Sequence, residues 1–231
     1  GGKSEWTVPY AFSMTGVVRR KEKTPETADQ DSWEVLKDKA FTGRVCILND
    51  IREVLGVGLK LCGLSLNSKD PAKIEKACDV MLPFKDAANK LDCVQYKTGL
   101  ASGEFWIAMG YSSDALQLKQ EGADVEFTVP KEGSTACFDE LVVASGGKHR
   151  SLAHAFIDWM YRPENAVANM RYACSAVPNS AMRELMTDDE KADPILNVSD
   201  EIMSRLEIIQ DVGESLDAYN KAWDRFMARR K

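Results

Sequence analysis

GRVCILNDIREVLGVGLKLCG, residues 43–63, joins a short apolar run directly to an amphipathic one. The run VCIL is typical of a buried parallel strand, which has a near-continuous series of apolar residues. Residues 51–62 then place apolar side chains as a largely buried helix does. Between the two lie Asp50 and Glu53, whose spacing matches a helix-capping pair. The stretch therefore predicts a strand and a helix, joined by two acids that cap the helix, bind a ligand, or do both.

Strands and helices alternate along the rest of the chain. Helix starts are marked by Asp70 with Pro71, and by Ser112 or Ser113. The alternation predicts an α/β fold with mostly parallel sheets. Further strands are expected in EWTVPYAF, GEFWIAMGY, ADVEFTVP and DELVVAS, and further helices in DPAKIEKACDVML, SSDALQLKQEG, KHRSLAHAFIDWMY, NAVANMRYA, NSAMRELM and residues 199–231.

The helix expected over KHRSLAHAFIDWMY, residues 148–161, ends before Pro163 and has a clear apolar face. We expect that face to pack inward, and we expect Trp33, Trp106 and Trp159 in the core. The residues expected to face inward from the helix are Leu152, Ala153, Phe156, Ile157 and Met160.

Few strands are visible for the number of helical segments, which suggests that strands of the fold lie outside this chain.

The composition is that of an ordinary globular protein, with 231 residues, 44% of them hydrophobic and 29% charged. A net charge of −6 disfavours nucleic acid as a partner and favours cationic ligands. No apolar run is long enough to span a bilayer. The opening GGKSEWTVPY lacks the features of a signal peptide, so we expect either a cytoplasmic protein or a mature or truncated exported one.

The cysteines and carboxylates argue against a metal site, a cofactor and an enzyme. The six cysteines include no CxxC pair, which disfavours zinc and redox chemistry, and we expect mostly buried thiols. Asp50 and Glu53 share one helical turn, so they cannot flank a substrate from opposite sides as paired catalytic acids do. The sequence shows no Ser-His-Asp, Cys-His or metal-binding constellation.

Several ordered phrases resemble one protein family. They are VPYAFSMTGVV, the stretch of residues 31–74, GEFWIAMGYSSDA, VPKEGSTACFDELVV, RPENAVANMRY, VPNSAM and QDVGE. In this order and spacing they are similar to the extracytoplasmic spermidine/putrescine-binding proteins of ABC importers. The resemblance runs from near Glu5 to the C-terminus.

The resemblance implies a type II periplasmic-binding-protein fold, in which two α/β lobes joined by crossing strands close on a ligand. It assigns residues 1–14 to the end of lobe 1 and a crossing strand, 15–135 to lobe 2, 136–186 to a return to lobe 1, and 187–231 to C-terminal helices on lobe 2. It also implies that this chain is similar to the C-terminal two-thirds of such a protein. An N-terminal segment of the same protein is then a further partner, without which we expect poor folding.

The resemblance also implies a ligand site. Asp50 and Glu53 match the carboxylates of a DxRE phrase that grips ammonium groups, Asp139 matches a second acid, and Tyr111 matches an aromatic residue of the cleft. Spaced carboxylates suit the charged ends of a polyamine, and aromatic faces suit its methylenes.

Some cleft positions depart from the family pattern. Cys137 stands where an aromatic residue is common, Ser175 where a tyrosine is usual, and Ile209 where some members have glutamine. Cys93 falls on a position that is usually small and polar. We predict that Cys137, Ser175 and Ile209 line the ligand site and change its affinity or its preference for ligand length.

Together these inferences predict a periplasmic protein or extracytoplasmic lipoprotein that captures polyamines. Its partners would be a small cation, an ABC permease and the ATPase of that permease, with no cofactor, metal or nucleic acid. An alternative is the same fold with a different small cationic or amine solute, and an enzyme that uses its carboxylates is less favoured.

Overall fold

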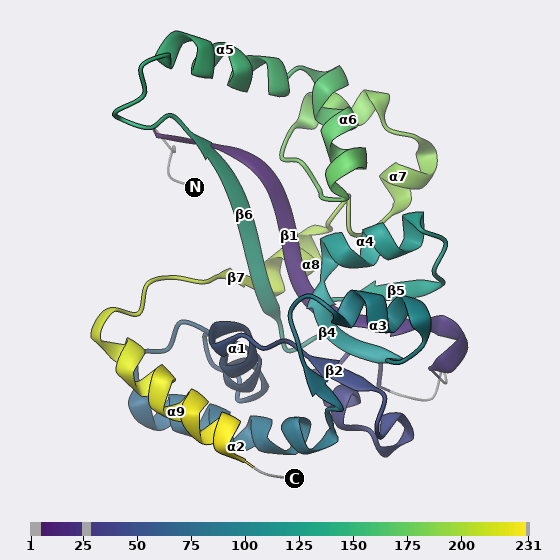
Figure 1. Ribbon diagram of the computed structural model, residues 1–231, viewed down its shortest axis with the longest axis vertical. Coiled ribbons are helices and arrows are strands. Elements are labelled where there is room, and N and C mark those ends of the chain that lie inside the picture. The colour runs from purple at the N-terminus through teal and green to yellow at the C-terminus, as the bar shows by residue number, and fades with distance from the viewer. Residues whose placement is uncertain (1–5, 25–28, 230–231) are drawn as a thin grey trace. The chain divides into compact units, whose positions relative to one another are not determined.

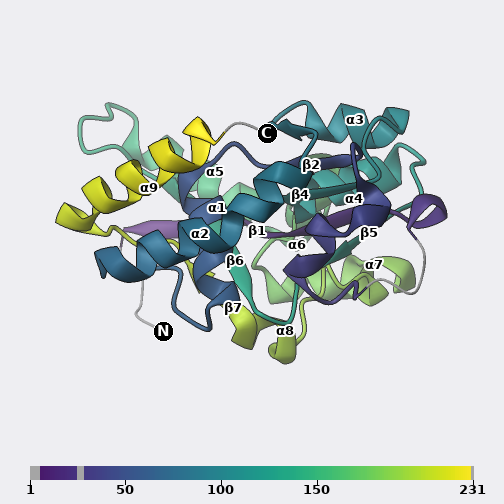
Figure 2. The same cartoon turned by 90° about the horizontal axis from the view of Figure 1, so that it is seen from below.

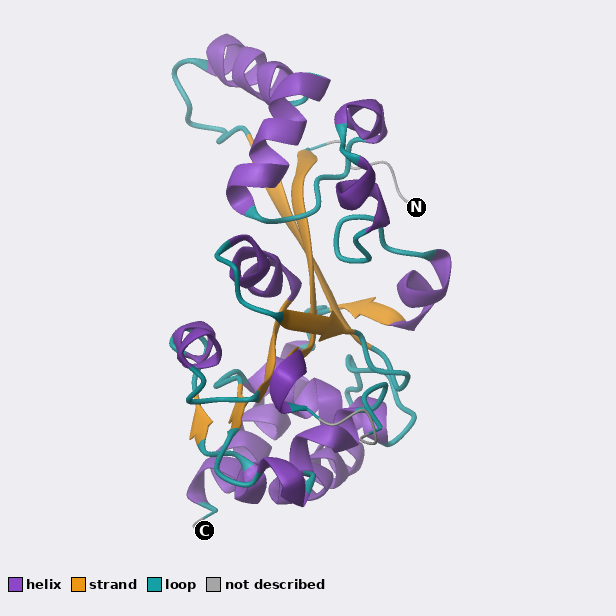
Figure 3. Cartoon of the chain, turned by 90° about the vertical axis from the view of Figure 1, so that its right-hand side faces the viewer, coloured by secondary structure: helices purple, strands orange, loops and turns teal. Residues whose placement is uncertain are grey.

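The computed structural model describes residues 6–24 and 29–229 of the chain (Figure 1). The described residues within 14–136 and 200–231 form one compact unit, and those within 1–13 and 137–199 form the other. Two long strands, β1 (Thr7–Arg20) and β6 (Ser134–Val142), contribute to both units (Figure 3). The predicted segment of residues 1–14 begins in residues 1–5, which lie outside the described residues.

The larger unit contains most of the sheet. Strand β2 (Val45–Ile47), where the apolar run predicted it, pairs in parallel with β3 (Lys90–Leu91) and β4 (Ile107–Tyr111). Strand β1 runs antiparallel to β4 and to β5 (Val125–Thr128). The sheet is therefore mixed rather than mostly parallel, because β1 enters against the direction of its neighbours. Strand β6 pairs in parallel with the short C-terminal strand β7 (Leu206–Ile208).

Three helices of the larger unit pack together, as Figure 2 shows: α1 (Ile51–Leu61), α2 (Pro71–Ala87) and α9 (Leu216–Ala228). The predicted start of α2 is confirmed, since the Asp70 side chain accepts a hydrogen bond from the Ala72 amide at 3.0 Å. The remaining helices of this unit are α3 (Tyr96–Ser102), α4 (Ser112–Gln120), α8 (Asp200–Arg205) and the 3-10 helices at Lys21–Lys23, Trp33–Lys37, Lys39–Phe41 and Gly213–Ser215.

The predicted cap of α4 is wrong. The capping position belongs to Tyr111, which makes no capping bond with its side chain. Ser112 lies within the helix, where its hydroxyl accepts a hydrogen bond from the Met14 amide at 2.9 Å. A tertiary contact with β1 therefore uses the group that local sequence assigned to capping.

The smaller unit has a compact core around methionines. It contains α5 (Arg150–Met160), α6 (Pro163–Ala173), α7 (Asp188–Ala192) and a 3-10 helix at Ser180–Leu185. The core residues Ala166, Val167 and Met170 come from α6, and Met182 and Met186 come from the segment that follows it. This packing places residues 187–199 with the smaller unit.

Helix α5 is correctly predicted as a helix but not as a buried one. Leu152 is 70% exposed, Phe156 52% and Trp159 47%, and the rings of Phe156 and Trp159 stack with centroids 6.1 Å apart. Ala153, Ile157 and Met160 are only half-buried. The expectation fails because the described part of the chain covers this face only in part. Of the other tryptophans, Trp33 is fully buried and Trp106 is half-buried.

The cysteines are thiols, and all six lie within the described residues. Cys46, Cys78 and Cys174 are buried, Cys62 and Cys93 are half-buried, and Cys137 is exposed. The expectation of mostly buried thiols thus holds for three of the six.

A close approach of α1 to α2 generates a test of this packing. A methyl group added at Gly58 would lie 2.5 Å from the Ala77 carbonyl oxygen, whereas one added at Gly56 would meet only an ordinary contact at 3.5 Å from Leu66. We expect Gly58→Ala to lower the free energy of unfolding by about 1–3 kcal/mol, because it forces the helices apart. Gly56→Ala is the matched control and should be neutral or stabilising by up to about 1 kcal/mol. Urea denaturation measures both, and an equal effect of the two substitutions would contradict the packing.

Candidate functional site

The carboxyl ends of the three parallel strands bring predicted site residues together. Asp50 follows β2, Cys93 follows β3, and Tyr111 ends β4. Because these strands point the same way, the residues beyond their ends meet at one edge of the sheet, where α/β folds bind ligands. The ionisable groups of Glu53, Cys93 and Asp50 all interact electrostatically with the Tyr111 hydroxyl, so they lie close together. We call Asp50, Glu53 and Cys93 the acidic cluster.

Asp50 caps helix α1, as the sequence predicted. Its Oδ1 atom accepts hydrogen bonds from the amides of Arg52 at 2.8 Å and Glu53 at 2.9 Å. These amides lack partners within the helix, and the helix dipole favours a negative charge at this end. Asp50 is also half-buried rather than enclosed. The side chain is therefore fixed in place while part of it faces solvent.

Glu53 lies in a different environment, although it is only one turn away. Its side chain faces the hydroxyls of Thr15 on β1 and Thr135 on β6. The residue is 8% exposed, and no donor among the described residues bonds its buried Oε2 atom. Burial raises the pKa of Glu53 to about 7, an effect that the two threonine hydroxyls oppose and the charge of Asp50 reinforces.

Arg52 is the nearest cation along the chain, but its guanidinium group is engaged elsewhere. Nη1 donates to the Gln210 carbonyl at 3.0 Å and Nη2 donates to Asn67 Oδ1 at 3.1 Å. The guanidinium carbon lies 4.7 Å from the centre of the Tyr219 ring. Asn67 Nδ2 donates to the Ile208 carbonyl at 2.9 Å. These bonds hold the predicted site residue Ile209, which is half-buried, beside the start of α1.

The backbone of Tyr111 is held by a second tyrosine. Its amide donates to the Tyr96 hydroxyl at 2.9 Å. The ring of Tyr96 can lie this close only because residue 110 is glycine, since a Cβ there would be 2.5 Å from the ring. Burial, followed by the interactions with the ionisable groups of Glu53 and Cys93, raises the pKa of Tyr111 well above its usual range. Its hydroxyl is therefore protonated, and its half-buried ring borders the acidic cluster.

The loop after β3 adds a neutral thiol to the acidic cluster. Asp92 fixes this loop by accepting hydrogen bonds from the amides of Val94 and Gln95, each at 2.7 Å, and by an ion pair with Lys90 at 2.9 Å. The Lys90 contact is the main reason that the pKa of Asp92 falls to about 2. Burial raises the pKa of Cys93, with the charges of Asp50 and Asp92 adding to the effect. Cys93 is therefore a thiol rather than a thiolate.

The smaller unit holds the other three predicted site residues. Cys137 and Asp139 are two positions apart on β6, so they share one face of the strand, and both are exposed. Phe138 between them packs on the ring of Phe12, with centroids 4.8 Å apart. Ser175 is buried, and its hydroxyl donates to the Phe12 carbonyl at 2.9 Å. The structure thus brings Asp50, Glu53, Tyr111 and Ile209 together in one unit and places Cys137, Asp139 and Ser175 in the other. A single site made of all seven stays a prediction.

Sequence reasoning left Thr15 unassigned and missed Thr135. Thr15 lies directly opposite Tyr111 in the register of β1 and β4. Its carbonyl accepts a hydrogen bond from Ser134 Oγ at 2.6 Å, which fixes the start of β6 against it. The positions of both threonines follow from how these strands lie against one another. The local sequence around either residue does not show this.

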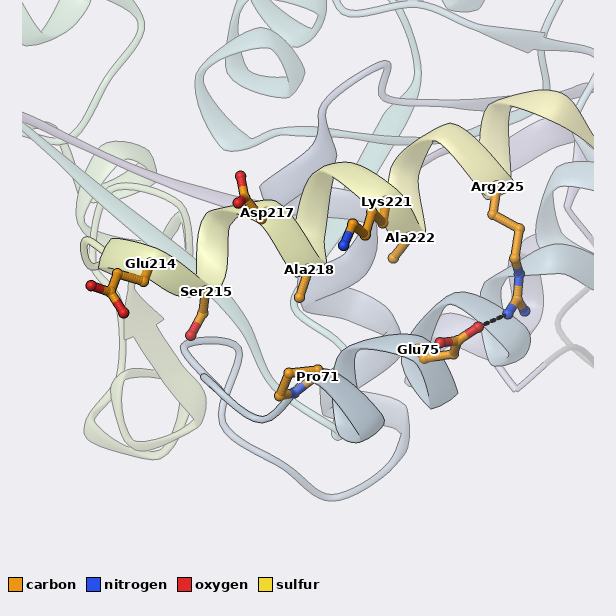
Figure 4. A pocket seen from close by; sticks show the side chains of 9 residues that line it. All are labelled: Pro71, Glu75, Glu214, Ser215, Asp217, Ala218, Lys221, Ala222 and Arg225. Atoms are coloured by element: carbon orange, nitrogen blue, oxygen red, sulfur yellow. Dashed lines mark hydrogen bonds and ion pairs between the residues drawn. The ribbon is translucent and has the colours of Figure 1, made fainter.

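A groove of about 370 Å³ runs between the start of α2 and α9 (Figure 4). It contains none of the predicted site residues. Its basic side chain Arg225 makes ion pairs with Glu75 and Asp79 of α2. Lining residues also include Ser215, Asp217 and Lys221. The balance of charges within the groove gives no indication of a particular ligand.

Residues 6–24 and 29–229 contain no group of three His, Cys, Asp or Glu side chains arranged to hold a metal ion. None of the helices in these ranges combines the length and apolarity needed to cross a membrane.

Comparison with known proteins gives consistent matches. The profile of the family described as bacterial extracellular solute-binding protein matches residues 3–197. A putrescine/cadaverine-binding protein of Pseudomonas aeruginosa is 29% identical, with 98% of this chain and 67% of that protein covered. The spermidine/putrescine-binding periplasmic protein of Escherichia coli is 24% identical, with 98% and 65% covered. This chain therefore spans about two thirds of the length of these relatives.

Solved structures agree. The spermidine/putrescine ABC transporter substrate-binding protein PotD of Streptococcus pneumoniae superposes with a TM-score of 0.89 at 27% identity, covering 96% of this chain and 69% of that one. The predicted periplasmic-binding-protein fold is thereby confirmed, and so is the resemblance drawn from the sequence phrases.

The burial of Glu53 generates a prediction about stability. The folded chain keeps the Glu53 proton up to about pH 7, whereas the unfolded chain releases it near the ordinary pKa of 4.5. The free energy of unfolding should therefore fall as the pH rises through this window, by about 3 kcal/mol. Glu53→Gln cannot ionise, so from pH 4.5 to pH 8 its stability should gain about that amount relative to the unsubstituted protein. Urea denaturation of the full-length protein at the two pH values measures this. Glu214→Gln, at an exposed position, is the control. A difference in the free energy of unfolding between Glu53→Gln and the unsubstituted protein that does not change with pH would contradict the burial of Glu53.

Proposed function

We propose, from the premise that the chain belongs to the bacterial extracellular solute-binding protein family, that it captures a polyamine and delivers it to an ABC transporter. The family consists of binding proteins outside the cytoplasm, so the predictions that the chain is not an enzyme and is extracytoplasmic are confirmed. The names of the relatives, which include putrescine, cadaverine and spermidine binders, support a polyamine as the solute.

The observation that carries the proposal is the acidic cluster at the carboxyl ends of β2, β3 and β4. Asp50 and Glu53 supply carboxylates for an ammonium group, and Glu53 Oε2 has no donor among the described residues. Arg52, the adjacent cation, directs guanidinium hydrogen bonds to Gln210 and Asn67, and its charge only partly offsets the effect of burial on Glu53, whose pKa stays raised. An ammonium group offers three donors and a positive charge, which this arrangement lacks.

Tyr111 provides the apolar part of the proposed site. Its half-buried ring borders the two carboxylates and can cover the first methylenes of an amine chain. We further propose that Asp139, an acid that the resemblance assigns to the ligand site, binds the second ammonium group of a polyamine.

An alternative solute is a different small cation or amine. The observation that favours it is the chemistry of the positions that depart from the family pattern. Ile209 offers no hydrogen bond from its side chain, and the Ser175 hydroxyl is already engaged by Phe12. A site that keeps its carboxylates but has fewer aromatic and hydrogen-bonding side chains suits a shorter or monovalent amine as well as a polyamine.

Calorimetric titration of the full-length protein at pH 8 with putrescine, spermidine and a monoamine tests the proposal. We expect dissociation constants near micromolar for a polyamine, and losses of about 10- to 100-fold in Asp50→Asn and Glu53→Gln, because each removes a charge-assisted hydrogen bond. Asp139→Asn should weaken the polyamines but not the monoamine. Asp224→Asn, an exposed acid on α9, is the control. Tighter binding of the monoamine than of either polyamine would favour the alternative, and no binding of any amine would overturn the proposal.

The role of Tyr111 is tested separately with a matched pair of substitutions. Tyr111→Phe keeps the aromatic face, so we expect putrescine affinity to change less than about threefold. Tyr111→Leu removes the aromatic face and should weaken binding by about 2- to 30-fold, the value of a cation–π contact of about 0.5–2 kcal/mol. Neither change affects the hydrogen bond from the residue 111 amide to Tyr96. An equal loss in both variants would assign the effect to the hydroxyl instead.

A further inference from the structure

The surroundings of Glu53 bear on when its carboxyl group is ionised. The carboxylate is enclosed by three elements of the larger unit: α1, which bears it, and strands β1 and β6, which present Thr15 and Thr135. Two hydroxyls are weaker partners than a cation, and they leave Oε2 buried without a donor among the described residues. A buried anion in this setting is costly, because it has lost water and has two hydroxyls rather than a cation as its hydrogen-bond partners.

The charged and titratable groups that face Glu53 do not relieve this cost. Asp50, on the same turn, is an acid and disfavours a second negative charge. Arg52 lowers the pKa of Glu53, but its guanidinium group is bound to Gln210, Asn67 and Leu66 and lies over Tyr219. The remaining neighbours are Cys93 and Tyr111, both neutral and each facing a further acid, Asp92 and Asp114 respectively.

We propose that Glu53 holds a proton while the site is empty and releases it to solvent when an amine binds, so that ligand capture is coupled to proton release. This inference rests on the proposed function and adds a regulation of the same site. The ammonium group of the ligand stays protonated throughout. The only bond broken is the O–H bond of the Glu53 carboxylic acid, whose proton goes to the buffer, and the resulting carboxylate accepts a hydrogen bond from the incoming ammonium group.

The coupling sets a pH window. With a pKa of about 7 in the empty protein, only about a tenth of the Glu53 side chains are ionised at pH 6, and about nine tenths are ionised at pH 8. Affinity for a cation that requires the ionised form should therefore rise about tenfold from pH 6 to pH 8. Binding should release about 0.9 protons at pH 6, about half a proton at pH 7 and about 0.1 at pH 8. The amino groups of putrescine remain charged over this range, as an aliphatic amine with a pKa of about 10 does.

The test is calorimetric titration of the full-length protein with putrescine at pH 6, 7 and 8, each in phosphate and in MOPS. These buffers differ in ionisation enthalpy, so the difference in binding enthalpy between them counts the protons released. We expect the tenfold rise in affinity and the falling proton count given above. Glu53→Gln should bind more weakly, with an affinity that is flat with pH and with no proton release. Asp50→Asn is the matched control, because it removes the other carboxylate and should weaken binding while still releasing a proton at pH 6.

The outcomes separate this inference from the proposed function. Putrescine binding with a flat affinity and no proton release at pH 6 would overturn the inference and leave the proposed function intact. Proton release that persists unchanged in Glu53→Gln would also overturn it, since another group would then be the source. No binding of putrescine at pH 8 would overturn the proposed function and the inference together.

Discussion

The enclosure of one carboxylate, that of Glu53, is the constraint around which the larger unit is arranged. Its side chain projects from the first turn of α1 to where β1 and β6 present the threonine hydroxyls. Those two strands are tied together by the bond from Ser134 Oγ to the Thr15 carbonyl. The same turn of α1 sends Arg52 the other way, to hold the segment after β7. A single helical turn thus fixes elements from the beginning, the middle and the end of the chain.

Local sequence predicted the part of this arrangement that local physics determines. The apolar run of β2, the capping oxygen of Asp50 and the amphipathic pattern of α1 are all interactions within a few residues. Asp50 and Glu53 were therefore found without the structure. Thr15 and Thr135 were not assigned, because their position depends on how β1 registers against β4 and how β6 begins. A strand register of this kind is set by distant partners, and the residues themselves carry no mark of it.

Two failures of the sequence reasoning, on the burial of α5 and on the direction of the strands, have the same cause. The pattern of α5 shows that one face is apolar, but a pattern cannot say what covers that face, and Phe156 and Trp159 are exposed in the described structure. The alternation of strands and helices suggested parallel sheets, but β1 runs antiparallel because of where the chain enters the larger unit. Periodicity determines the type of an element, whereas its partners and direction follow from the topology.

Asp50 and Glu53 are acids of similar intrinsic strength, three positions apart, but their surroundings are opposite. Asp50 has two backbone amides, a favourable helix terminus and partial access to water. Glu53 has two hydroxyls, a buried oxygen without a donor in the described residues, and an acidic neighbour. Asp50 is therefore a hydrogen-bonded cap that is partly open to solvent, whereas Glu53 can ionise only at a cost that a bound cation would offset. Below about pH 7, a site of this kind gains the charge of Glu53 mainly when a cation is present to balance it. The empty site therefore avoids the cost of two uncompensated carboxylates in one helical turn, while the occupied site keeps the strength of both.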